Sequence, residues 1–139
     1  MADKQSIPER LRRQVRERAN GRCEYCLLHS EDMLLPHQVD HIVAEQHGGT
    51  LDLDNLAWSC FFCNHTKGPN IASLDPDTKH IVPLFNPRTQ QWSRHFRLNG
   101  PRIEPITASG RATANLLQFN TTLRLQERVI LISIGHYPR

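Results

Sequence analysis

The chain has 139 residues, of which 38% are hydrophobic and 22% charged, and its formal net charge is +3. This length is typical of a single domain and is too short to fill two separate hydrophobic cores. The sequence has no long apolar run, and no apolar segment in its opening MADKQSIPERLRR, so we expect no membrane span and no signal peptide, and we predict a cytoplasmic protein.

Charge is distributed unevenly along the chain. Residues 1–22 carry a net charge of +4, residues 23–66 contain seven acidic residues and no Lys or Arg, and residues 67–139 carry a net charge of +6. An acidic centre between basic flanks suits a protein that holds a divalent cation in its middle and a polyanion at its sides. Basic residues that only solvate surface helices give the same pattern, so charge alone leaves both interpretations open.

The first predicted element is a helix over residues 8–19. Leu11, Val15 and Ala19 recur at helical spacing and give it a narrow apolar stripe, while arginines cover much of the remaining surface. These arginines suit contacts with phosphate, although a solvated helix face would have the same composition.

The later elements follow from β-branched runs, turn residues and helical spacing. In chain order they are a strand ending near His41, a loop over 47–56, a short strand over 57–59, a helix near 64–68, a loop over 69–91, a hairpin of 92–98 and 102–106, and helices over 107–119 and 122–134. The last segment is ambiguous, because VILISI also favours a strand. The predicted fold class is α+β.

Four cysteines form two Cys-x-x-Cys pairs, Cys23 with Cys26 and Cys60 with Cys63. A Cys-x-x-Cys turn presents two thiolates to one ion, and a second turn completes the tetrahedron that zinc prefers. The pattern therefore predicts a structural Zn²⁺ site. A redox dithiol needs only one such pair, and disulfides are rare in the cytoplasm.

Polar residues lie between and just after the two pairs: Asp40, His41, Asn55 and Asn64. With the cysteines they make VDHIVAEQHGGTLDLDNLAWSCFFCNHTKG resemble the ββα-metal core (His-Me finger) of the HNH endonuclease family, in its zinc-bearing branch. The core resemblance covers about residues 22–68. LFNPRTQQWSRHF and SGRAT are also similar to small stand-alone bacterial HNH proteins. The resemblance implies one HNH endonuclease domain over 1–139, with a C-terminal extension over about 80–139.

A phosphodiester hydrolase needs an activated water, and histidine is the side chain that ordinarily accepts a proton near neutral pH. We therefore assign His41 as the general base. The resemblance implies that Asn55 orients the His41 imidazole, and that Asp40 and the last residue of the motif bind one divalent cation.

The chain departs from the family pattern at that last position, where the family often has histidine and this chain has Asn64. Asn64 is the predicted cation ligand, and His65 is the fallback ligand. An amide oxygen favours Mg²⁺ or Mn²⁺ over softer ions. Lys67 lies three residues beyond Asn64 on a similar helix face and is a candidate phosphate contact.

The resemblance implies a metal-dependent endonuclease that nicks or cuts DNA and leaves 5′-phosphate and 3′-hydroxyl ends, acting as a monomer or homodimer. The alternative is a non-catalytic zinc-ribbon module that binds nucleic acid. It accounts for the cysteines and arginines but gives no reason for Asp40, His41 and Asn55 to occur together. A thiol redox protein is a third hypothesis, which stoichiometric zinc at the four cysteines would exclude.

Overall fold

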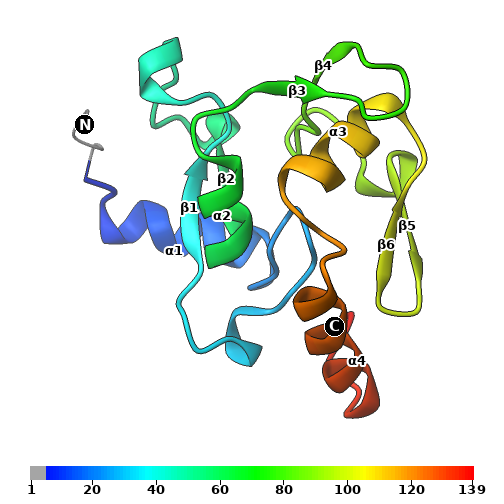
Figure 1. Ribbon diagram of the computed structural model, residues 1–139. Coiled ribbons are helices and arrows are strands. Elements are labelled where there is room, and N and C mark those ends of the chain that lie inside the picture. The colour runs from blue at the N-terminus through cyan, green and yellow to red at the C-terminus, as the bar shows by residue number, and fades with distance from the viewer. Residues whose placement is uncertain (1–5) are drawn as a thin grey trace.

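The computed structural model describes residues 6–139, and its helices and small sheets confirm the predicted α+β fold (Figure 1). In chain order the elements are α1 (Glu9–Arg18), β1 (Gln38–His41), β2 (Leu56–Ser59), α2 (Phe61–Lys67), β3 (Ala72–Leu74), β4 (Ile81–Pro83), β5 (Phe96–Asn99), β6 (Arg102–Pro105), α3 (Ala108–Leu116) and α4 (Thr122–Ser133). The strands form three antiparallel pairs, β1 with β2, β3 with β4 and β5 with β6.

The β1–β2 hairpin lies between α1 and α2. Val15 of α1 forms a buried apolar cluster with Leu56 and Trp58 of β2, and Val39 of β1 packs against that cluster. Asp40 points the opposite way, because successive side chains of a strand alternate between its faces, and it contacts α2. The hairpin therefore has one apolar face against α1 and one polar face against α2.

Residues 69–91 are not a simple loop, because they contain the β3–β4 hairpin. Asp75 closes the connection by accepting hydrogen bonds from the backbone N–H of Asp77 and the hydroxyl of Thr78. Arg111 of α3 then binds the same carboxylate through two hydrogen bonds of 2.9 Å. Strands of three residues give too few alternating positions to be recognised in the sequence, and the contact that holds them comes from a distant helix.

The segment 122–134 is a helix, as predicted, but its buried face is unusual. Arg124, Arg128 and Leu131 are buried, whereas Leu123 and Ile130 are more than 60% exposed. The guanidinium of Arg128 donates to backbone carbonyls of the β5–β6 turn and of the segment that follows α3. Within residues 6–139, no helix combines the length and apolar character needed to cross a bilayer.

Candidate functional site

The four cysteines come together in the core. Cys23 and Cys26 belong to the turn that precedes β1, whereas Cys60 is the N-cap of α2 and Cys63 lies in its first turn. All four side chains are buried, and their Sγ atoms lie within 4.8 Å of one another. In each pair, the backbone N–H of the second cysteine donates to the Sγ atom of the first at 3.4 Å. The two pairs therefore form one cluster, as the sequence predicted.

This cluster has the dimensions of a tetrahedral zinc site. Zn–S bonds of about 2.3 Å place the sulfur atoms about 3.8 Å apart, and the Sγ atoms of Cys26 and Cys60 lie 3.6 Å apart. That separation is far longer than a disulfide bond, and all four cysteines are free. Four thiolates are the donor set of a structural zinc ion, so the residues fit the metal that the sequence predicted.

Asp40 lies inside the interface between β1 and α2, with only 3% of the residue exposed. The Tyr25 hydroxyl donates to Oδ2 of Asp40 at 2.6 Å, and Nζ of Lys67 lies 3.2 Å from the same oxygen and 3.3 Å from Oδ1. Burial raises the pKa of the Asp40 carboxyl above its ordinary value, and the Lys67 ammonium and the Tyr25 hydroxyl oppose this rise. The first cysteine turn and α2 thus hold the carboxylate from two sides.

Lys67 is 2% exposed, and its ammonium is surrounded by protein acceptors. Besides Asp40, it donates to the backbone carbonyls of His41 at 3.1 Å and Ile42 at 3.2 Å. These contacts occupy the side chain that the sequence offered as a phosphate contact. In this conformation the ammonium supports the backbone on which the His41 side chain is mounted.

We expect Lys67→Met to lower the free energy of unfolding by about 3–5 kcal/mol, because it leaves the buried Asp40 carboxylate without its ion-pair partner. Denaturant unfolding followed by tryptophan fluorescence measures the loss. The matched control is Lys79→Met at an exposed lysine, which should change stability by no more than about 0.5 kcal/mol. In a double-mutant cycle with Asp40→Asn, the double variant should lose less stability than the sum of the losses in the two single variants. A loss equal to that sum would contradict the ion pair.

His41 is the last residue of β1, and the Nε2 atom of its imidazole is buried with no hydrogen-bond partner among residues 6–139. The Asn55 side chain makes its hydrogen bonds just beyond His41. Its Oδ1 accepts from the N–H of Val43, and its Nδ2 donates to the carbonyls of Val43 and Thr50, each at 2.9 Å. The N–H of Ile42 also donates to the Asn55 carbonyl at 2.9 Å. Asn55 thus fixes the backbone that follows His41. Its side-chain hydrogen bonds go to backbone groups and not to the His41 imidazole.

Asn64 and His65 lie on different sides of α2. The Asn64 amide donates to Oε1 of Gln38, which precedes Asp40 by two residues and shares its face of β1. His65 is exposed, and its ring stacks on Phe61 with the centroids 5.9 Å apart. Asn64 therefore lies at the same β1–α2 interface as Asp40, whereas His65, the fallback ligand, lies outside this interface. A carboxylate and an amide supply the oxygen donors that Mg²⁺ and Mn²⁺ prefer.

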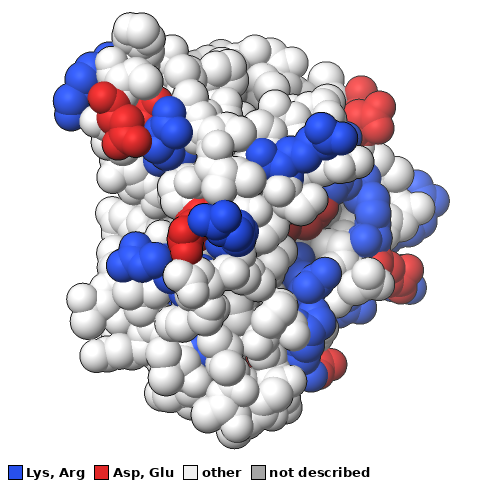
Figure 2. Space-filling view, turned by 90° about the vertical axis from the view of Figure 1, so that its right-hand side faces the viewer, with Lys and Arg blue, Asp and Glu red and all other residues white. Residues whose placement is uncertain are grey.

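Several basic residues are committed to the protein interior. Among the C-terminal Lys and Arg residues, Lys67, Arg124 and Arg128 are buried. In α1, Arg12 donates to the His37 carbonyl, and Arg18, although exposed, donates to the carbonyls of Leu53 and Leu56. The other arginines of this helix are also exposed: Arg10, Arg13 and Arg16. Figure 2 shows a second face of the molecule, where basic groups are scattered, several beside acidic residues, around a broad uncharged area.

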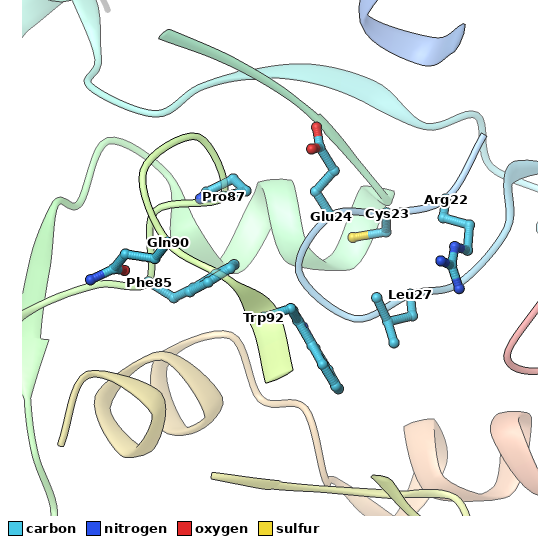
Figure 3. A pocket seen from close by; sticks show the side chains of 8 residues that line it. All are labelled: Arg22, Cys23, Glu24, Leu27, Phe85, Pro87, Gln90 and Trp92. Atoms are coloured by element: carbon cyan, nitrogen blue, oxygen red, sulfur yellow. The ribbon is translucent and has the colours of Figure 1, made fainter. Parts of the chain in front are cut away.

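A cavity of about 150 Å³ opens beside the first cysteine turn (Figure 3). The rings of Phe85 and Trp92 lie on one side of it, and Arg22 and Leu27 lie on the other. Apart from Cys23, no residue predicted for the site lines this cavity. It is therefore separate from the interface that contains Asp40.

Sequence reasoning missed three residues at the site. Tyr25 lies between the first two cysteines, and no local pattern connects it with Asp40. Gly49 lies in the predicted loop over 47–56, and a Cβ at this position would lie 1.6 Å from the Val43 carbonyl oxygen, so only glycine allows the loop to close. Arg124 had a detectable signal, because Arg124 and Arg128 are spaced i, i+4 and therefore share one face of α4.

Comparison with known proteins identifies one family. Residues 23–70 match the family model described as HNH endonuclease, and this segment contains the four cysteines, the β1–β2 hairpin and α2. No curated protein and no solved structure matches the chain significantly. The resemblance seen in the sequence and the four-cysteine cluster seen in the structure agree with this family.

Proposed function

We propose that this chain is a metal-dependent endonuclease that hydrolyses phosphodiester bonds of DNA, because its residues 23–70 match the family model described as HNH endonuclease. The family match supports membership of a nuclease family. The substrate, the reaction and the role of each site residue are our proposal.

The observation that carries the proposal is the unpaired ring nitrogen of His41. Its Nε2 is buried and has no hydrogen-bond partner within residues 6–139, and the backbone at and just after His41 is held by Lys67 and Asn55. An imidazole nitrogen without an internal partner, on a fixed backbone, can accept a proton from a water that attacks phosphorus. The general base is therefore Nε2 of His41, and the proton moves from water to that atom.

Asp40 and Asn64 are the proposed ligands of the catalytic divalent cation, with Mg²⁺ or Mn²⁺ favoured by their oxygen donors. The bound cation supplies positive charge that offsets the charge developing on the phosphate. Lys67 and Tyr25 orient the Asp40 carboxylate through the contacts described above. The ammonium of Lys67 also shares this carboxylate, which limits the negative charge that the site offers to a cation.

Asn55 is proposed to position His41 through the backbone. Its side chain ties Val43 to Thr50, so the chain direction after β1 is fixed without a contact to the imidazole. Three exposed arginines of α1, Arg10, Arg13 and Arg16, are proposed to contact the phosphates of DNA, since within residues 6–139 they make none of the backbone contacts that Arg12 and Arg18 make.

The test is incubation of folded, zinc-loaded protein with supercoiled plasmid, linear duplex, single-stranded DNA and RNA, each with Mg²⁺, with Mn²⁺ or with neither. We expect nicked or linear plasmid only when the divalent cation is present. If every substrate stays intact while the protein is folded and loaded, the endonuclease proposal fails. Binding to DNA without cleavage would instead favour the zinc-ribbon binding module.

A further inference from the structure

The guanidinium of Arg124 is buried next to the cysteine cluster. The residue is 3% exposed, and its Nη2 atom lies 3.5 Å from Sγ of Cys63 and 3.7 Å from Sγ of Cys60. Its Nη1 atom donates to the Leu117 carbonyl at 2.9 Å. The arginine thus reaches from α4 to the second cysteine pair.

Aromatic rings complete the surroundings of this guanidinium. The ring of Phe62 lies 5.7 Å from its central carbon, and the ring of Phe119 lies 5.9 Å away. None of the ion pairs formed within residues 6–139 gives Arg124 a carboxylate partner. The half-buried Glu127 lies one turn further along α4 and does not pair with it.

A buried charge without an opposite charge costs several kcal/mol, so buried guanidinium groups are nearly always paired. Within residues 6–139, the only groups that can carry a full negative charge and that contact Arg124 directly are the sulfurs of Cys60 and Cys63. Four thiolates around one Zn²⁺ leave a net charge of −2, and one guanidinium offsets half of it. The arginine and an anionic metal cluster therefore stabilise each other.

We infer that Arg124 is a positioning residue of the metal centre: it donates to the thiolates of Cys60 and Cys63, offsets part of the cluster's charge, and thereby fastens α4 to the metal site. This inference requires a metal at the four cysteines but does not require DNA cleavage. Docking of the C-terminal helix α4 and retention of the metal are then linked, because the guanidinium of Arg124 and the anionic metal cluster each offset the charge of the other.

The test uses the full chain loaded with Co²⁺ in place of Zn²⁺, because cobalt reports the state of its sulfur ligands in its absorption spectrum. A cation beside a thiolate stabilises the sulfur electrons and raises the energy of the sulfur-to-cobalt charge-transfer band. We expect Arg124→Met to move this band to lower energy and to lower the Zn²⁺ affinity, measured by chelator competition, by roughly 10–100-fold, the range for losing a hydrogen-bond partner of metal ligands. Arg124→Lys keeps the charge and should restore most of both properties.

The matched control is Arg128→Met, which removes a buried arginine of the same helix whose hydrogen bonds go to the carbonyls of Pro101 and Phe119 and to Asn120. It should lower stability and move the cobalt band less than Arg124→Met does, because Arg128 makes no hydrogen bond to a cysteine sulfur within residues 6–139. An unchanged band and affinity in Arg124→Met, or an equal band shift in the control, would overturn the inference.

If Arg124→Met does not fold, Arg124→Gln and Arg124→Lys decide. Glutamine keeps hydrogen-bond donors without charge, so its band should be shifted relative to lysine, and coincident bands would overturn the inference. The measurements contain no DNA, so a negative result here and a failure of the endonuclease proposal are distinguishable.

Discussion

Replacing His41 with alanine is expected to slow the nicking of supercoiled plasmid by roughly 10²–10⁴-fold, the contribution typical of a general base. The substitution removes Nε2 and leaves intact the contacts that hold the site, because Lys67 and Asn55 bind the backbone around His41 and not its side chain. The measurement is the initial rate of conversion of supercoiled to open-circular plasmid with Mg²⁺ or Mn²⁺. Circular dichroism and zinc content show that the variant is folded.

The control for this experiment is His80→Ala, which removes another imidazole of the chain from an exposed position in the connection between β3 and β4. It should nick at the wild-type rate. Equal rates for wild type and His41→Ala would mean that the activity comes from a contaminant or that the base is another group. Both explanations would rule out His41 as the general base.

Removal of zinc is expected to abolish cooperative unfolding of the protein. Structural zinc sites in small peptides contribute about 10–16 kcal/mol of apparent binding free energy, which is comparable to the roughly 5–15 kcal/mol net stability of a typical domain. The same loss is expected for Cys60→Ser, because this residue supplies a sulfur and also caps α2 through its bond from the Cys63 N–H. Thermal unfolding followed by circular dichroism, with zinc content measured in parallel, checks both.

Specificity is tested by adding metal back to the chelated protein. Zn²⁺ should restore a cooperative transition, whereas Mg²⁺ should not, since magnesium prefers oxygen donors and keeps its waters. Metal-free protein that unfolds at the same temperature as the loaded form would contradict a structural role for the cluster. Stoichiometric zinc would also exclude a redox function for the two cysteine pairs.

Local patterns predicted the elements around the site. The helical stripe of α1, the end of β1 at His41 and the return of β2 all follow from spacing within about ten residues, whereas α2 begins at Phe61, before the predicted helix near 64–68. The two cysteine pairs were predicted to meet although 33 residues separate Cys26 from Cys60, because metal coordination imposes one geometry on all four side chains. These predictions succeeded because each depended on one strong physical constraint.

The partners of individual side chains could not be predicted in the same way. Lys67 matched a surface phosphate contact by spacing, yet it lies buried against Asp40, 27 residues earlier. Arg124 reaches Cys63 across 61 residues, and Arg111 reaches Asp75 across 36. Such pairs depend on which helix faces meet in the folded chain, and periodicity along one segment contains no information about the neighbour that covers it.

The position of the loop between β1 and β2 divides the molecule into two complementary pieces. Residues 1–48 contain Asp40, His41 and one cysteine pair, and residues 49–139 contain the second pair with Asn55, Asn64 and Lys67. Strand pairing, the Asp40–Lys67 ion pair and the four-cysteine cluster all cross this boundary. Neither piece contains a complete site, so assembly of the two pieces, rather than continuity of the backbone at Gly48–Gly49, is what creates both the metal cluster and the proposed catalytic centre.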